Sequence, residues 1–419
     1  MGSLKSLFAP TDMTVGPPWK KIIAFAIPML IGNIAQQLYN TVDSIVVGRY
    51  VGDNALAAVG SAGPILNLLL VLFVGISVGA SIMVSQYFGA REREELSQTI
   101  GCCITLTAIS SVIIMALAPM LIRPLLHLLN TPESIVEWCD SYLTILFVGI
   151  AGMAFYNILS GILRGLGDSV SALIYLLVST VLNIILDVWF VAGLSMEVAG
   201  VALATAIAQG ISAVLCLLKL SRMKEIFDLK PRYLKPGKRH SLMVVKLGLP
   251  SGLTQAIFSM AMIVVQSLTN SFGEMVIAAN VIIMRVDGFA MMPNFSFGTA
   301  MTTYAGQNVG ANNYKRVDDG AKQGTLIAVV TSTIITALIL IFGKYLMGVF
   351  TETAELVQLS NHMMHILAAG YIAMAVTQCL SGVMRGAGDT MTPMWISLIT
   401  TVALRVPVAY GIAWLTRSE

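Results

Sequence analysis

Long apolar runs, separated by short polar breaks, extend along most of the chain. Each run has at least the roughly 20 residues that an α-helix needs to cross the hydrocarbon core of a bilayer. The breaks carry residues that favour turns, as in Gly52-Asp53-Asn54 and Asn130-Thr131-Pro132. The pattern predicts eleven membrane-spanning helices, near residues 21–47, 55–87, 97–122, 136–161, 169–192, 198–218, 242–269, 275–306, 321–348, 359–383 and 391–415.

The amino-acid composition supports a membrane protein. Only 11% of the residues are charged, 56% are hydrophobic, and the mean hydropathy is +0.81, whereas a soluble domain carries about 25% charged residues. These values exclude a disordered chain, a coiled coil and an ordinary soluble enzyme. The net charge of only +3 argues against a nucleic-acid partner. We therefore expect the lipid bilayer to be the solvent of this chain.

The distribution of Lys and Arg predicts how the chain is oriented. With the N-terminus inside, the inner segments hold 19 of the 25 Lys and Arg residues and the outer segments hold four. The other two, Arg285 and Arg405, lie within predicted spans. Basic loops stay on the cytoplasmic side, so we expect a multi-pass protein of the cytoplasmic membrane with a cytoplasmic N-terminus.

Three separated motifs repeat along the chain at one offset. LSGILRGLGDS at residues 159–169 and LSGVMRGAGDT at residues 380–390 share seven of eleven residues, at an offset of 221. The same offset relates Gln86 to Gln307, and Pro28 and Pro250 differ by 222. A single offset at three places indicates duplication. The glycine-rich RGxGD segments are expected to be tight turns between helices rather than phosphate-binding loops.

The repeat predicts the architecture. Six spans return the first half to its starting side, so the halves share one orientation and are related by an axis along the membrane normal, as in many transporters. We expect an all-α integral membrane fold of two pseudo-symmetric six-helix bundles: an N-terminal lobe (1–219), a cytoplasmic linker (220–241) and a C-terminal lobe (242–419). Because Glu419 corresponds to Val198, the sequence is expected to lack its twelfth helix; a natural eleven-span protein is the alternative.

Few carboxylates lie within the predicted spans. A charge at membrane depth costs at least about 2.5–3.5 kcal/mol, so such residues persist mainly for function or in pairs. Asn183 and Asp187 are four residues apart and share a helix face. Their oxygens suit H⁺ or Na⁺, and Asp43 adds a second carboxylate if the first and fifth spans pack together. The alternative is that both acids are helix-end residues, solvated near the outer interface.

The two halves differ at these acids. At offsets of 221–222 Asp43 corresponds to Val265 and Asp187 to Val408. Selection for the scaffold alone would treat the halves alike, so the N-terminal half is expected to bind the coupling cation. Arg285 and Asp287, two residues apart, do not face each other on a helix and are expected to have a structural or gating role.

A substrate cavity is expected between the halves. Met suits apolar surfaces that accept many ligands, although ordinary helix packing is the alternative.

Pro28 removes a backbone hydrogen bond and would let the first helix bend. No metal arrangement is visible among the four His residues, and no Walker A loop is present, so ATP is not the expected energy source. The expected cleft residues are Gln36, Tyr39, Asn40, Gln255, Met284, Met291 and Met292.

These residues and motifs resemble the multidrug and toxic compound extrusion (MATE) family over nearly the whole chain. The motifs are VDSIVVGRYVGDNALAAVG (42–60), SQYFGAREREE (85–95), LRGLGDS (163–169), NIILD (183–187), GVALATAIAQ (200–209), GQNVGA (306–311) and MRGAGDT (384–390).

The resemblance implies an antiporter that exports organic, often cationic or aromatic, compounds by alternating access, driven by H⁺ or Na⁺ and needing no other cofactor. It implies two six-helix bundles around a central cleft and a cation site at Asp43, Asn183, Asp187 and Thr205. No metal is implied unless Na⁺ binds there. Some members place acids in spans seven and ten instead, where this chain has Gln255, Thr377 and Gln378.

Other functions stay open at this point. A lipid-linked oligosaccharide flippase of the same superfamily is the main alternative, although it should need a strongly cationic cleft. An intramembrane enzyme would need a catalytic constellation at depth, and none is visible. A passive channel is also open. The expected partners are small organic molecules and the lipid bilayer, without nucleic acid, and the chain is expected to act as a monomer.

Overall fold

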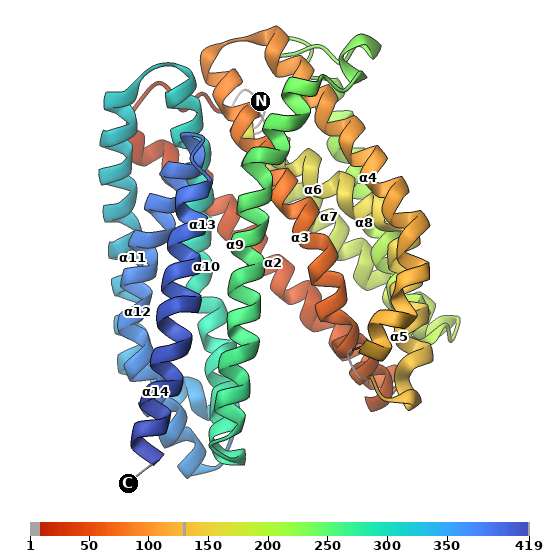
Figure 1. Cartoon of the computed structure of the whole chain (residues 1–419), viewed down its shortest axis with the longest axis vertical. Coiled ribbons are helices and arrows are strands. Elements are labelled where there is room, and N and C mark those ends of the chain that lie inside the picture. The colour runs from red at the N-terminus through yellow and green to blue at the C-terminus, as the bar shows by residue number, and fades with distance from the viewer. Residues whose placement is uncertain (1–8, 129–130, 418–419) are drawn as a thin grey trace. The chain divides into compact units, whose positions relative to one another are not determined.

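The protein is all-helical over residues 9–128 and 131–417, the part of the chain that the computed structural model describes (Figure 1). Two π-helical segments and one 3₁₀ turn accompany the α-helices. The elements are α2 (Pro18–Tyr50), α3 (Asp53–Ala90), α4 (Arg93–Leu128), α5 (Glu133–Val148), α6 (Ile150–Gly165), α7 (Ser169–Asp187), η1 (Val188–Gly193), α8 (Glu197–Ser221), η2 (Pro231–Leu234), α9 (Lys238–Asn270), α10 (Glu274–Gly310), α11 (Tyr314–Gly348), α12 (Ala354–Gly386), α13 (Met391–Ser397), η3 (Leu398–Arg405) and α14 (Val406–Arg417).

The helices confirm the expected membrane fold. Within the described residues ten helices are long and apolar enough to cross a membrane, and the count is eleven when α5 and α6 form one span. Those two helices meet at a bend of 52°, inside the single span predicted over 136–161. Backbone groups in lipid must be satisfied internally, which is why apolar runs of this length form helices.

Gly149, between α5 and α6, and Gly152 of α6 allow close packing beside the bend. A Cβ on Gly149 would lie 2.6 Å from the Cβ of Ala206, and a Cβ on Gly152 would lie 2.8 Å from the backbone nitrogen of Gly210. Real side chains do not approach so closely. Glycine at these positions therefore lets α6 pack directly on the backbone of α8, as small residues do in membrane helix pairs.

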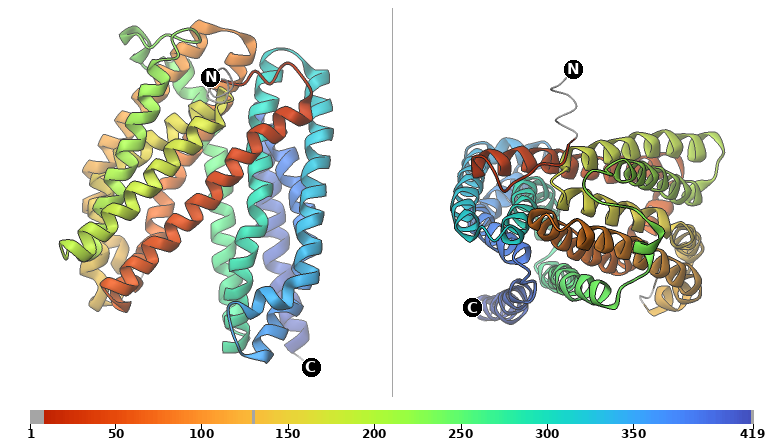
Figure 2. Two further views of the ribbon diagram at one scale, coloured as in Figure 1. Left: turned by 180° about the vertical axis from the view of Figure 1, so that it is seen from behind. Right: turned by 90° about the horizontal axis from the view of Figure 1, so that it is seen from above.

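The helices form two compact units. Unit 1 comprises Met1–Asp12 and Ile31–Gly252, and unit 2 comprises Met13–Leu30 and Leu253–Glu419. The units do not follow the chain order used for the predicted lobes. The first part of α2 belongs to unit 2, and the linker with the first part of α9 belongs to unit 1. Helix α2 nevertheless runs without a break through Pro28 (red in Figures 1 and 2).

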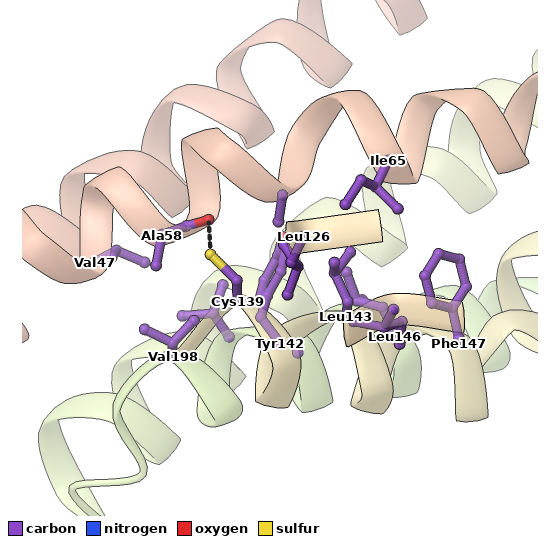
Figure 3. Close-up of a cluster of buried hydrophobic side chains, with 14 of the residues drawn as sticks. Val47, Ala58, Ile65, Leu126, Cys139, Tyr142, Leu143, Leu146, Phe147 and Val198 are labelled. Atoms are coloured by element: carbon purple, nitrogen blue, oxygen red, sulfur yellow. Dashed lines mark hydrogen bonds between the residues drawn. The ribbon is translucent and has the colours of Figure 1, made fainter. Parts of the chain in front are cut away.

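The core of unit 1 is closely packed around α5. Cys139, Leu143 and Phe147 of α5 are fully buried, and Cys139 donates a hydrogen bond from Sγ to the carbonyl oxygen of Ala58, 3.3 Å away (Figure 3). Val47 of α2 belongs to the same cluster. This core fixes α2, α3 and α5 relative to each other within unit 1.

Four glycines bring α3 and α9 together inside unit 1. A Cβ on Gly79 would lie 2.4 Å from the carbonyl oxygen of Val244, and a Cβ on Gly248 would lie 2.6 Å from that of Gly75. The spacings Gly75-x₃-Gly79 and Gly248-x₃-Gly252 are the small-residue pattern of close membrane helix crossings. The crossing explains why the first part of α9 belongs to unit 1.

Unit 2 holds the segment that precedes α2. Met13 is fully buried, and its backbone N–H donates to Oε1 of Gln307 at 2.8 Å. Its carbonyl oxygen accepts hydrogen bonds from Nδ2 of Asn308 and from the guanidinium of Arg316. Arg316 also donates to the carbonyl of Gly16 at 2.6 Å. The repeated GQNVGA motif thus fixes the start of the first span on unit 2.

The two RGxGD segments are turns, as expected. Gly167 has φ +82° and Gly388 has φ +98°, backbone conformations that favour glycine. The Asp that follows caps the next helix: Oδ1 of Asp168 accepts from the backbone N–H of Ser171 at 2.9 Å, and Oδ1 of Asp389 accepts from that of Thr392 at 2.9 Å. The motif is therefore a glycine turn followed by an N-cap.

We predict that Gly167→Ala lowers the unfolding temperature of the protein in detergent. The left-handed φ costs a non-glycine residue roughly 1–2 kcal/mol, and the new Cβ would lie 2.3 Å from the carbonyl oxygen of Thr11. The control is Gly210→Ala in α8, where an added Cβ meets no atom within 4 Å. Equal unfolding temperatures for the two variants would contradict the strain assigned to Gly167.

Candidate functional site

Polar residues of α2, α7 and α8 meet inside unit 1. They are Tyr39 and Asp43 of α2, Asn183 and Asp187 of α7, and Thr205 of α8. The hydroxyl oxygens of Tyr39 and Thr205 are 2.9 Å apart. All four residues of the expected cation site therefore lie together, and Tyr39, which was expected in the substrate cleft, joins them.

The amide of Asn183 joins the two carboxyl groups. Carboxylate oxygens accept hydrogen bonds, so the amide nitrogen belongs on their side. In that orientation it donates to Oδ2 of Asp187 at 3.0 Å and to Oδ1 of Asp43 at 2.9 Å. The amide oxygen then takes the position 3.3 Å from Oγ1 of Thr205, which can donate to it. One side chain thus orients three neighbours.

The carboxyl groups of Asp43 and Asp187 lie within hydrogen-bonding reach of each other. Two ionised carboxylates this close repel each other strongly when shielded from water. The pair is stable with a proton between its oxygens or with a bound cation. A carboxyl pair of this kind can therefore accommodate one positive charge.

Burial distinguishes these residues from solvated helix ends. Asn183 and Asp187 are 0% exposed, whereas Asp43 is half-buried, so burial argues against the solvated alternative for Asp187 and not for Asp43. Within the described structure, Oδ1 of Asp187 is buried and has no hydrogen-bond partner. Buried polar atoms are almost always paired, so an unpaired carboxyl oxygen marks a position for a proton or a cation.

The local helix geometry also changes at this point. Helix α7 ends at Asp187 and continues as the π-helical turn η1. Such turns are rare and are frequent at functional sites. Asp187 lies 18 residues after Ser169, about 27 Å along the helix, so the site is far from the RGLGD turn at the opposite end of α7.

Sequence reasoning missed Tyr142 of α5. This side chain is 7% exposed and lies close enough to Asp43 and Asp187 to interact with both electrostatically. The repeat contains a signal that could have identified it. Tyr142 corresponds to Met363 at the offset of 221, and Tyr39 corresponds to Ala261 at the offset of 222 that relates Pro28 to Pro250 in the same helix. These hydroxyl groups are therefore absent from the second half, like the acids.

Other predicted residues lie elsewhere. In unit 1, Gln36 is half-buried and Asn40 is exposed. In unit 2, Gln255 and Met284 are exposed, Met291 is half-buried and Met292 is buried. The sequence prediction that these residues share a cleft stays a prediction.

Arg285 and Asp287, which the sequence places on different faces of a helix, form no ion pair in the described part of unit 2. Asp287 instead lies at hydrogen-bonding distance from Tyr371 of α12. Nearby, Oδ1 of Asn294 accepts from the hydroxyl of Ser332 at 2.7 Å. Within the described residues no group of three or more His, Cys, Asp or Glu could hold a metal ion.

The chain is similar to known transporters along nearly its whole length. A family model described as MatE matches residues 28–189 and again residues 250–411. The probable multidrug resistance protein YpnP of Bacillus subtilis is 31% identical over 405 residues, which are 96% of this chain and 91% of YpnP. The probable multidrug resistance protein NorM of Thermotoga maritima is 25% identical, over 93% of this chain and 85% of NorM.

Solved structures show the same fold. A MOP superfamily transporter from Pyrococcus furiosus matches with a TM-score of 0.88 and 26% identity, covering 95% of this chain and 89% of that one. A crystal structure of MATE in the bent conformation matches with a TM-score of 0.89 and 26% identity, covering 95% of this chain and 88% of that one. The two-bundle fold expected from the repeat is thereby confirmed.

We predict that Asp187→Leu leaves the unfolding temperature unchanged or raises it. Leu keeps the branched shape of Asp and removes one of two carboxyl groups whose closeness and burial are costly. We expect this gain to offset the hydrogen bond that Asn183 loses. The control is Asp168→Leu at the other end of α7. Asp168 caps that helix and lies 3.8 Å from Nζ of Lys219, so its loss should cost roughly 1–2 kcal/mol. Thermal unfolding in detergent measures both; a large loss in Asp187→Leu would indicate a structural carboxylate.

Proposed function

We propose that this chain, which belongs to the MatE family, exports organic compounds in exchange for a coupling cation. Its family consists of transporters and not enzymes, and its relatives include multidrug resistance proteins. The resemblance seen in its sequence motifs is thereby confirmed, and the chain is a multi-pass membrane protein. The coupling, the direction of transport and the substrate class form the proposal.

One observation supports the coupling most strongly. Two carboxyl groups, the buried one of Asp187 and the half-buried one of Asp43, lie within hydrogen-bonding reach of each other and are bridged by Asn183. A scaffold gains nothing from such a pair, because an isolated buried charge is costly. A transporter gains a site whose charge changes by one when the cation leaves. The unpaired Oδ1 of Asp187 is the position where the incoming charge would bind.

The cation would reset the transporter. Binding to Asp43 and Asp187 from the outside favours the state that releases the drug, and release of the cation to the cytoplasm favours drug loading. Alternation between these states couples the two fluxes, because a ligand shifts an equilibrium only through its different affinity for the two states. Tyr39, Thr205 and Tyr142 would orient the carboxyl groups or offer further oxygen atoms.

Both H⁺ and Na⁺ fit this chemistry. A shared proton satisfies a carboxyl pair by itself, whereas Na⁺ would be held by the oxygens of Asp43, Asp187, Asn183 and Thr205, since hard cations prefer oxygen ligands. We propose no other cofactor. We also propose that the N-terminus is cytoplasmic in the cell membrane, from the bias of Lys and Arg, and that the chain acts as a monomer.

The first test is efflux of ethidium from cells that express Asp43→Asn or Asp187→Asn. Each variant keeps the shape of the side chain but removes its titratable charge, so the site can no longer exchange the coupling cation. Efflux should therefore fall by about tenfold or more, which corresponds to about 1.4 kcal/mol. The control is Asp318→Asn, an exposed acid that pairs with Lys322, and its efflux should match that of the parent chain. With equal expression, unchanged efflux in both site variants would refute the proposed role.

The second test identifies the cation. In proteoliposomes holding the purified chain, an imposed pH gradient and an imposed Na⁺ gradient are applied separately, and drug movement is followed by fluorescence. We expect one gradient to drive uphill movement and Asp187→Asn to abolish it. Movement that follows only the drug's own gradient would instead indicate a passive channel.

A further inference from the structure

An open cavity lies in unit 2 between the end of α11 and the beginning of α12. It has a volume of about 460 Å³ and is lined by Lys344 of α11 with Gln358, Asn361, His362 and His365 of α12. The two helices lie side by side (Figures 1 and 2). The lining contains a cation and hydrogen-bonding groups but no carboxylate. The cavity plays no part in the carboxyl site of unit 1.

The repeat explains what is unusual about this lining. At the offset of 221, Lys344 corresponds to Arg123, Gln358 to Glu137 and Asn361 to Asp140. Gln86 and Gln307 before these positions, and Leu159 and Leu380 after them, differ by the same 221 residues. The positions between them therefore align without a gap. The second half therefore keeps the cation and replaces each acid by the amide of the same shape.

In the first half the cation is neutralised internally. Nε of Arg123 donates to Oδ2 of Asp140 at 2.8 Å, and Glu137 adds a further favourable charge interaction. In the second half Asn361 and Gln358 cannot supply that charge. Within the described residues Lys344 forms no ion pair. Glu355 lies one turn nearer the start of α12 and makes no ion pair either.

The amide of Asn361 is held in place by close packing. A Cβ on Gly343 would lie 2.5 Å from Oδ1 of Asn361, so glycine is needed for α11 to approach this side chain. That oxygen is buried and has no hydrogen-bond partner in the described structure. With the oxygen turned to Gly343, the amide nitrogen is the atom left to donate into the cavity.

His365 contributes an acceptor. Its Nδ1 lies 2.7 Å from the carbonyl oxygen of Asn361, and because a carbonyl only accepts, Nδ1 must bear the hydrogen. The other ring nitrogen, Nε2, of the neutral ring is then an acceptor for a hydroxyl group. The cavity thus offers a cation, amide donors and an acceptor within one wall.

The position of the cavity along α12 corresponds to the level of the lipid headgroups. Helix α12 has 33 residues, about 50 Å, while the hydrocarbon core is about 30 Å thick, so about 10 Å projects at each end. His362 lies eight residues after Ala354, about 12 Å along the helix, near the level of the lipid headgroups. Apolar side chains beside the cavity, including Ile341, Tyr345 and Ile366, are exposed where acyl chains would lie.

We propose that this cavity binds the headgroup of an anionic phospholipid, with the phosphodiester on Lys344 and the amides of Gln358 and Asn361. The lipid phosphate replaces the carboxylates that the first half supplies from its own chain. A glycerol headgroup fits better than ethanolamine, because Lys344 repels an ammonium group and Nε2 of His365 accepts from a hydroxyl. The inference rests on the repeat and the cavity and does not depend on cation coupling.

The test is native mass spectrometry of the purified full chain, titrated with phosphatidylglycerol, phosphatidylethanolamine or phosphatidylcholine. We expect one tight site for phosphatidylglycerol. Lys344→Ala should weaken it about tenfold, the loss of one hydrogen bond to a charged group. Asn361→Asp should weaken it likewise, because the new carboxylate pairs with Lys344 as Asp140 pairs with Arg123, and that variant should be at least as stable as the parent chain.

The reciprocal change in the first half is the sharpest control. Glu137→Gln combined with Asp140→Asn leaves Arg123 without its acids and should create a second site for phosphatidylglycerol. Asp187→Asn should bind the lipid like the parent chain, which separates this proposal from the coupling site. Inorganic phosphate and glycerol 3-phosphate at millimolar concentration should compete poorly, because they lack acyl chains.

Three results would overturn the proposal. The first is equal affinity of the parent chain for all three lipids. The second is unchanged phosphatidylglycerol binding in folded Lys344→Ala and Asn361→Asp, with folding checked by the unfolding temperature. The third is displacement of the lipid by free phosphate at comparable concentration, which would make the cavity a phosphate site and not a lipid site.

Discussion

The carboxyl groups of Asp43 and Asp187 lie against each other inside unit 1, and in the described structure no Lys or Arg pairs with either. Such a pair requires a scaffold that holds it while its charge is incompletely balanced. The core around α5 and the glycine contacts of α6 with α8 supply that scaffold. Asn183 then determines the distance between the carboxyl groups by donating to both. The surrounding packing is rigid where the site needs fixed geometry.

The two halves share their structural motifs, and the proposed sites lie at positions where their sequences differ. Both halves keep the glycine turn and the aspartate cap of RGxGD. The proposed coupling site lies where only the first half has acids and hydroxyl groups. The cavity of α11 and α12 appears where only the second half has lost its acids. Each proposed site lies where one half has a charged residue and the other half has an uncharged one. Comparing the two halves therefore identifies candidate functional positions.

Much of this could be predicted from the sequence because bilayer physics is so restrictive. Apolar length predicted the spans, and the fixed offset predicted two related bundles. The grouping of Asp43, Asn183, Asp187 and Thr205 was predicted from polar residues at a depth where polarity is costly, and cation binding there stays a prediction. Tyr142 was missed because a Tyr near a helix end is ordinary in a membrane protein; only its position relative to Asp43 gives it meaning. The bend at Gly149 was missed because glycine also serves packing in unbroken helices.

The grouping of Met13–Leu30 with unit 2 has a consequence for the order of assembly. The residues that hold Met13, including Gln307, Asn308 and Arg316, are synthesised almost 300 residues after this segment. At a synthesis rate of about 5–20 residues per second, many seconds pass between the synthesis of Met13 and the synthesis of the residues that contact it. Until then the apolar face of this segment contacts lipid or whatever protein accompanies insertion. The segment Met13–Leu30 thus reaches its final contacts long after it has been synthesised.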